Sequence, residues 1–175
     1  MAPARTPRLL LVGLALLAAV ACGAQIHTGD APAALGPAPQ VAPSDGALTF
    51  GAGHTFANGV TITVSTPKSF RPSAGAYPAS DRAAAFEIEV TNAGADPYRL
   101  SGLSVSATVA GAQAIQVVDL TQGFNGIVDA GKDIFPGHTV QLNLAFAVPR
   151  QPAELRLVLR PDTTSAVAAT YCGSA

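Results

Sequence analysis

The sequence predicts an all-β fold, a sandwich of seven or eight short antiparallel strands, and two observations carry this prediction. From about residue 48 onward, apolar residues recur at every second position in several runs, and clusters of Gly, Pro, Asn and Asp separate the runs. Beyond the N-terminal segment, no stretch keeps a helical period. Because successive side chains of a strand point to opposite faces, each run has one apolar face, and two sheets packed together bury such faces.

The five strongest strand predictions are residues 60–64, 86–90, 103–109, 140–148 and 155–159. Each alternates Val, Ile, Leu or Phe with smaller or polar residues, so each has a core face and a solvent face.

Weaker alternation predicts strands over 113–120 and 166–171, and a short strand over 54–57.

The predicted strands over 54–57 and 60–64 are joined by Asn58-Gly59, the strongest two-residue hairpin signal in the sequence. A type I′ turn needs positive φ at both central positions, which Asn and Gly tolerate best. With Ala57 opposite Val60 around this turn, Phe56 would lie on the face opposite to Val60. Either both faces of this strand are covered, or the register is different.

The N-terminal segment has the features of an export signal. Arg5 and Arg8 precede an apolar run of 13 residues over 9–21. Such a run is typical of the core of a signal peptide and shorter than the roughly 20 residues that a transmembrane helix needs. We therefore expect residues 1–21 to be a signal peptide that is removed.

Small residues precede Cys22 at the end of this run, and they resemble the lipobox of bacterial lipoproteins. In that family the Cys receives a diacylglyceryl group and becomes the first mature residue, so the resemblance implies lipidation of Cys22. The family most often has Leu three residues before the Cys, where this chain has Ala19. Since Ala19-Val20-Ala21 is also a site for ordinary signal peptidase, a freely secreted protein is the alternative.

Residues 22–47 are predicted to form a tether. The segment holds four Pro and four Gly with almost no hydrophobic periodicity, so it cannot bury enough apolar surface to offset its ordering entropy. We expect a flexible linker here and the β-sandwich domain over 48–175.

The charge balance argues against nucleic acid as a partner and against membrane attachment through basic residues. The chain has 10 Lys+Arg and 11 Asp+Glu, without the dense basic footprint that nucleic acid requires. Removal of the signal takes Arg5 and Arg8, which leaves 8 basic and 11 acidic residues and a net charge of −3. Membrane attachment would then depend on the lipid, and the protein would lie on the outer side of the cell membrane.

The abundance of Ala, Gly, Pro and Arg indicates a bacterium with a GC-rich genome.

Strand and turn motifs also carry a family resemblance. They are the Asn-Gly hairpin, Val-Thr-Ile-Thr-Val-Ser-Thr-Pro over 60–67, Phe-Glu-Ile-Glu-Val-Thr-Asn over 86–92, and Pro136-Gly137. Over about 50–162 the chain resembles the immunoglobulin-like domain of unknown function in surface lipoproteins of Actinobacteria and other Gram-positive bacteria. It is also similar in pattern to a mycobacterial secreted immunogenic antigen. The resemblance implies an exported immunoglobulin-like sandwich, often lipid-anchored, with no established activity.

Residues for catalysis or metal binding show no productive spacing. The three histidines are scattered, there is no Gly-x-Ser-x-Gly motif, and the mature chain has no Met. Glu87 and Glu89 share one strand face, which reads as a solvent face. Three carboxylates, Asp119, Asp129 and Asp133, lie beside or within a Gly-rich loop but lack the spacing of a calcium loop. We expect no enzyme activity, cofactor or metal, with a metal-handling or hydrolytic protein as the alternative.

Binding or scaffolding through loops is the remaining function, with an unidentified protein or cell-envelope component as partner. The second Cys, Cys172, would be the only remaining thiol if Cys22 is lipidated, and would otherwise be able to form a disulfide with it. The candidate interaction residues are aromatic or polar residues of loops: Phe70, Arg71, Tyr77, Phe124, Asn125 and Phe135.

Overall fold

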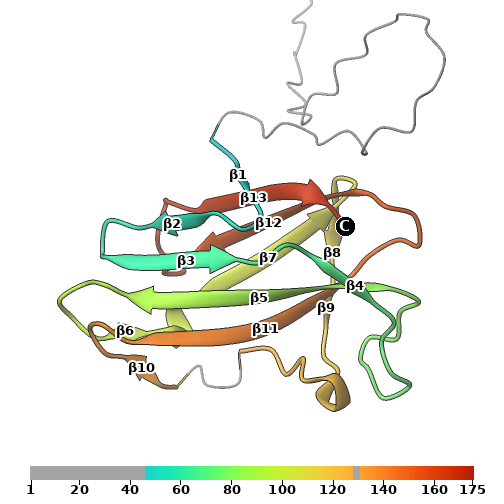
Figure 1. The fold of residues 1–175 in the computed structure, drawn as a ribbon, viewed down its shortest axis with the longest axis horizontal. Helices are drawn as coiled ribbons and strands as arrows, with labels where there is room; N and C mark the ends of the chain where they lie inside the picture. Colours follow the sequence, from blue (N-terminus) through green and yellow to red (C-terminus); the bar gives the residue numbers. More distant parts are fainter. Residues whose placement is uncertain (1–45, 128–130) are drawn as a thin grey trace, which may run out of the picture.

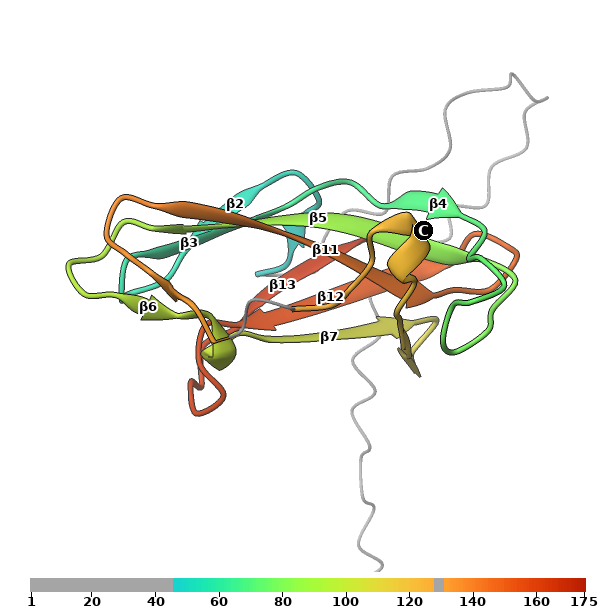
Figure 2. The same ribbon diagram turned by 90° about the horizontal axis from the view of Figure 1, so that it is seen from below.

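A computed structural model describes residues 46–127 and 131–175, and it confirms the predicted all-β sandwich. Two sheets lie face to face, as Figure 1 and Figure 2 show from two directions. In order across the sheet, the five-stranded sheet contains β1 (Leu48–Thr49), β13 (Ala169–Ser174), β12 (Glu154–Arg160), β7 (Ser104–Val109) and β8 (Ala112–Ala114). The six-stranded sheet contains β2 (Gly53–Thr55), β3 (Val60–Val64), β5 (Ala83–Asn92), β11 (Thr139–Ala147) and β9 (Gln116–Val117), and β4 (Lys68–Phe70) also pairs with β5.

Smaller elements complete the fold. Strands β6 (Tyr98–Arg99) and β10 (Asp133–Ile134) form a two-stranded sheet, and two 3-10 turns are η1 (Leu100–Gly102) and η2 (Leu120–Gln122). The expected signal peptide, Cys22 and most of the expected tether lie outside the described residues. No helix within 46–127 and 131–175 has the length and apolar character to cross a bilayer.

The core lies between the two large sheets, where the predicted period-two alternation is confirmed. The central pair, β5 and β11, runs in register from Ala83 opposite Ala147 to Thr91 opposite Thr139. Every second side chain of these strands points inward, and all of these side chains are buried except that of Val140, which is half-buried. The largest fully buried side chains are Tyr171, Phe86, Ile62, Ile88, Leu100, Leu144, Leu155, Leu157, Leu159, Val60, Val64 and Val90.

The outer face of the six-stranded sheet is divided along its length. Glu87 and Glu89 on this face of β5 are exposed, as the alternation predicts. Further along the same face, Ala83 of β5 and Ala145 of β11 are fully buried and belong to a second, small apolar cluster. Loops therefore cover this face at one end of the sandwich only, where the outward residues change from charged to Ala.

The first hairpin has a different register from the one a two-residue turn implies. Thr55 lies opposite Thr61, and Phe56 donates its amide to the Val60 carbonyl oxygen at 2.8 Å. The loop therefore has three residues, Ala57 to Gly59, with Gly59 at φ +81°. Phe56 and Val60 then share the core face, and both are buried. The prediction of a two-residue turn was wrong, because burial of Phe56 selects the three-residue loop with a left-handed Gly.

Gly59 is a sensitive position in this hairpin. A Cβ at Gly59 would lie 2.6 Å from the backbone nitrogen and Cα of Gly94, in addition to the strain of its positive φ. We expect Gly59→Ala to lower the free energy of unfolding by at least about 1 kcal/mol. Chemical denaturation measures this change.

Gly111→Ala is the matched control for that experiment. Gly111 has φ +80°, but a Cβ there meets nothing within 4 Å. It carries the backbone strain alone, so Gly59→Ala must be the more destabilising of the two. Equal losses would contradict a tight contact between the hairpin and Gly94.

Three further predictions of the strand pattern need correction. The expected strand over 113–120 is divided into β8 in one sheet and β9 in the other, because the chain crosses between the sheets at Ile115. Strand β1 pairs with β13 in parallel, whereas all strands were expected to be antiparallel. The described residues form thirteen strands rather than seven or eight, since several edge segments have only two or three residues.

Two tyrosines bridge distant parts of the sandwich. Tyr171 of β13 has no exposed surface, and its hydroxyl donates to the carbonyl oxygen of Ile62 in the opposite sheet at 2.9 Å. Its ring stacks on Phe50 with 6.2 Å between centroids. Tyr98 donates its hydroxyl to the Pro161 carbonyl oxygen at 2.6 Å. Burial raises the pKa of Tyr171 to about 12, and burial together with the charge of Asp162 raises the pKa of Tyr98 to about 12.

Candidate interaction site at one end of the sandwich

The site is organised around the carboxylate of Asp119, which has no exposed surface. Its Oδ2 accepts the amide N–H of Ser73 at 2.7 Å and the Nε2–H of Gln122 at 2.9 Å. Its Oδ1 accepts the hydroxyls of Ser73 at 2.8 Å and of Thr121 at 2.7 Å. One side chain thus joins two loops that are 46 residues apart in the sequence. We call the region that these two loops form, 71–78 and 118–125, the loop end.

These hydrogen bonds act on the acidity of Asp119. The hydrogen bond from the backbone amide of Ser73 lowers the pKa of Asp119 most, and burial raises it. Hydrogen bonds from the side chains of Thr121, Ser73 and Gln122 lower the pKa further. Together they lower the pKa of Asp119 to about 2 from its ordinary 3.8. Hydrogen bonds to the charged form stabilise that form, so the carboxylate stays ionised and keeps its acceptors directed at the loop.

A strip of exposed apolar side chains lies on the backbone that Asp119 braces. Tyr77 and Val118 exchange two backbone hydrogen bonds of 2.9 and 2.8 Å, which places their side chains on the same face. Leu120 follows two residues after Val118, where η2 begins, and its side chain is also exposed. The exposed fractions are 80 % for Tyr77, 37 % for Val118 and 72 % for Leu120. We call these three residues the apolar strip.

Two phenylalanines cover the second apolar cluster at this end. The rings of Phe70 and Phe124 lie 4.6 Å apart between centroids, and both pack against the small cluster that Ala76, Ala83, Val117 and Ala145 form. Phe124 is held by two backbone hydrogen bonds of 2.9 Å with Asp119. These rings therefore support the loops from below, whereas Tyr77 is the aromatic residue that faces solvent.

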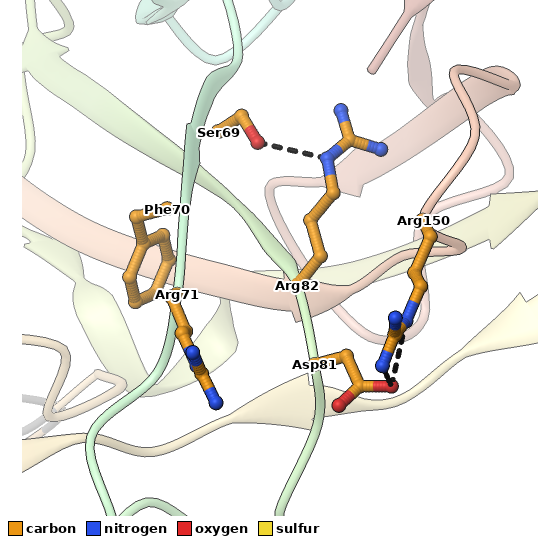
Figure 3. Close-up of a pocket in the computed structure, with 6 residues that line it drawn as sticks. All are labelled: Ser69, Phe70, Arg71, Asp81, Arg82 and Arg150. Atoms are coloured by element: carbon orange, nitrogen blue, oxygen red, sulfur yellow. Dashed lines mark hydrogen bonds and ion pairs between the residues drawn. The ribbon is translucent and has the colours of Figure 1, made fainter.

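An open groove of about 460 Å³ adjoins the loop end, and Figure 3 shows its lining. Arg150 donates from Nε and Nη2 to Oδ2 of Asp81 at 3.1 and 2.9 Å. Arg82 donates from Nε to the Ser69 hydroxyl at 2.8 Å and from Nη1 to the Pro149 carbonyl oxygen at 2.7 Å. We call it the arginine groove, lined by Ser69, Phe70, Arg71, Asp81, Arg82 and Arg150.

The structure brings most of the expected interaction residues together at this end. Phe70, Arg71, Tyr77 and Phe124 contribute to the strip, the groove or the layer beneath them, and Asn125 is exposed next to Phe124. The exception is Phe135, which follows β10 at the opposite end of the sandwich and contacts His138 (Figure 1). Cys22 lies outside the described residues.

Sequence reasoning missed four other residues of this end, Val118, Leu120, Arg82 and Arg150, and considered Asp119 only as a possible calcium ligand. One signal was available, because the Ala residues at outward positions of 83–85 and 145–147 mark a covered part of the sheet. The contact between Asp119 and Ser73 carries no sequence signal, since these two residues lie 46 residues apart in the chain.

The residues weighed for metal binding or catalysis are dispersed. Asp119 is surrounded by protein donors, and Asp133 pairs with Arg99 at 3.3 Å at the opposite end. His54 packs edge-on against Phe56, and His138 makes a hydrogen bond to the Pro136 carbonyl oxygen. Asp129 is outside the described residues, within which no group of three His, Cys, Asp or Glu is placed to hold a metal ion. Cys172 is half-buried in β13.

Comparison with known proteins identifies the fold alone. No family model matches the chain, and no curated protein matches it either. Among solved structures, ycdA of Bacillus subtilis, a provisionally assigned lipoprotein, has a TM-score of 0.54 and 15 % identity, and the match covers 69 % of this chain and 37 % of ycdA. The yjhA protein of the same bacterium has a TM-score of 0.52 and 16 % identity over 70 % of this chain and 97 % of yjhA. This chain therefore shares the sandwich fold of two bacterial proteins, one of them more than twice the length of the part it matches.

Proposed function

We propose that this protein is a lipid-anchored, extracytoplasmic binding module that presents its loop end to a partner and performs no catalysis. The observation that carries the proposal is the apolar strip. Three neighbouring apolar side chains are exposed on a backbone that a buried carboxylate holds in place. Contiguous exposed apolar surface marks interaction sites, and a rigid support lowers the ordering cost of binding.

The anchor is supported by the lipobox-like sequence before Cys22 and by the fold likeness to the provisional lipoprotein ycdA. A diacylglyceryl group supplies two acyl chains, which is enough for stable membrane attachment. The absence of catalysis is supported by the contacts of His54 and His138, which are with an aromatic ring and a backbone carbonyl oxygen.

Replacing Cys22 with Ala tests the anchor. We expect the wild-type protein to be recovered with the membranes and Cys22→Ala to be recovered in the soluble fraction or the medium. The control is Cys172→Ala, which keeps the lipid acceptor and should stay with the membranes. Recovery of Cys22→Ala with the membranes would contradict the lipid anchor, and recovery of the wild type in the medium would favour the freely secreted alternative.

Site-specific photo-crosslinking tests the binding surface. A benzoylphenylalanine at position 77 should form adducts in living cells, because Tyr77 is 80 % exposed at the loop end. The matched control is position 135, where Phe135 is 59 % exposed at the opposite end. Adducts at 135 alone, or equal adducts at both positions, would move the binding surface away from the loop end.

A further inference from the structure

The arginine groove has an excess of positive charge that its own residues do not neutralise. Its lining includes three guanidinium groups but a single carboxylate, and that carboxylate, Asp81, is bound by Arg150. Within the described part of the chain, the guanidinium of Arg71 makes no hydrogen bond or ion pair, and only its carbonyl oxygen is engaged, by Gln122. This excess stands out in a chain whose formal net charge is −1.

We propose that the arginine groove binds a side-chain carboxylate of an acidic protein segment, whose neighbouring apolar residues lie on the apolar strip. This inference rests on the proposed function and names the chemistry of the partner.

The guanidinium groups suit a carboxylate. A guanidinium offers five N–H donors in a planar fork that matches a carboxylate, and it holds its charge at all physiological pH values. Arg82 uses two of these donors on Ser69 and Pro149, which fixes the direction of its side chain at the groove. Figure 3 shows Arg71 beside Phe70 and Arg150 on the opposite side, with Asp81 between them, whereas the guanidinium of Arg82 lies beside Ser69 and is directed away from that of Arg71. A carboxylate that enters between Arg71 and Arg150 has a guanidinium group on either side.

Position favours a protein segment over a lipid surface. Gln122 donates to both Asp119 and the Arg71 carbonyl oxygen, at 2.9 and 3.1 Å, so the groove and the apolar strip share one braced backbone. An extended segment with acidic and apolar residues is therefore able to contact both features at once.

The test uses the full mature chain in a non-ionic detergent and two fluorescent peptides. One peptide carries two Glu and two Leu among Gly and Ser residues, and the other has Gln in place of each Glu. By fluorescence anisotropy, the Glu peptide should bind at least about tenfold more tightly than the Gln peptide, and added salt should weaken its binding. No binding of the Glu peptide, or equal binding of both peptides, would overturn the proposal.

Variants assign the effect to the groove. Arg71→Glu should weaken binding of the Glu peptide at least about tenfold, and Arg71→Lys should fall between it and the wild type. Since the Arg71 side chain is exposed, both variants should keep the wild-type melting temperature. Arg99→Glu, at the opposite end, is the matched control and should bind as the wild type does. Equal losses in Arg71→Glu and Arg99→Glu would indicate a general charge effect and contradict the groove.

A lipid source is tested separately with vesicles of phosphatidylglycerol and phosphatidylcholine. Vesicle binding that depends on Arg71, without binding of the Glu peptide, would assign the groove to lipid phosphate and overturn the proposal. If crosslinking at position 77 persists but the Glu peptide binds no better than the Gln peptide, the carboxylate partner is ruled out. The proposed function as a binding module would still stand.

Discussion

Replacing Tyr171 with Ala should lower the free energy of unfolding by about 3–5 kcal/mol, a loss typical of deleting a buried aromatic side chain. Tyr171 is fully buried, stacks on Phe50, and links the two sheets through its hydrogen bond to Ile62. Tyr171→Phe keeps the ring and should cost about 1 kcal/mol, the net contribution of one hydrogen bond. Urea denaturation of both variants separates ring packing from the inter-sheet hydrogen bond.

Tyr77 provides the control for this comparison. It is the same residue type at 80 % exposure, so Tyr77→Ala should change the free energy of unfolding by less than about 0.5 kcal/mol. Similar losses at positions 77 and 171 would contradict the inter-sheet role of Tyr171.

Tyr171 also makes the free energy of unfolding depend on pH in the alkaline range. Its pKa rises on folding from 10.0 to about 12, because burial disfavours the phenolate. The protonated form is thus favoured in the folded state, so this contribution is complete below pH 10 and is lost as pH rises towards 12. Tyr171→Phe should show a smaller loss of stability than the wild type between pH 10 and 12, with Tyr98 titrating in both proteins.

Replacing Asp119 should have the largest effect on the loop end. Asp119→Ala leaves the Ser73 amide and the side chains of Thr121 and Gln122 without their shared acceptor. Asp119→Asn keeps the shape but puts an NH2 group where one oxygen accepts hydrogen bonds. We expect both variants to melt several degrees lower. Hydrogen exchange at the Ser73 amide should accelerate at least about tenfold, because the loop opens locally.

The change in the free energy of unfolding at acid pH measures the contribution of the Asp119 charge. Its pKa falls on folding from 3.8 to about 2, mainly through the hydrogen bond from the Ser73 amide. The ionised form is favoured in the folded state, so the contribution is complete above pH 4 and is lost as pH falls towards 2. The difference in stability between wild type and Asp119→Asn should therefore shrink over this range.

Asp133→Asn is the control, because Asp133 makes an exposed ion pair with Arg99. Exposed pairs contribute little, so this variant should melt close to the wild type. A difference between wild type and Asp119→Asn that does not change between pH 4 and 2 would contradict the proposed role of the carboxylate.

Alternation of apolar residues determined the sandwich and most of its core. Ile62, Phe86, Leu144 and Leu157 are all buried where the period-two pattern expects them, since a strand with one apolar face must bury it. The same reasoning failed at the first hairpin. There the local preference of Asn58-Gly59 was outweighed by burial of Phe56, which depends on the opposite sheet.

The sequence alone determined the strand pattern, the Cys22 motif and the set of loops that carry candidate residues. Only the tertiary structure decided which of those loops meet, because hydrogen bonds and ring contacts join residues that are far apart in the chain. Asp119 reaches Ser73, Phe124 meets Phe70, and Arg150 meets Asp81, each across more than 40 residues. Periodicity describes one strand at a time, whereas the loop end forms only once β4, β5, β11 and β9 have paired in one sheet and brought their connections to the same end.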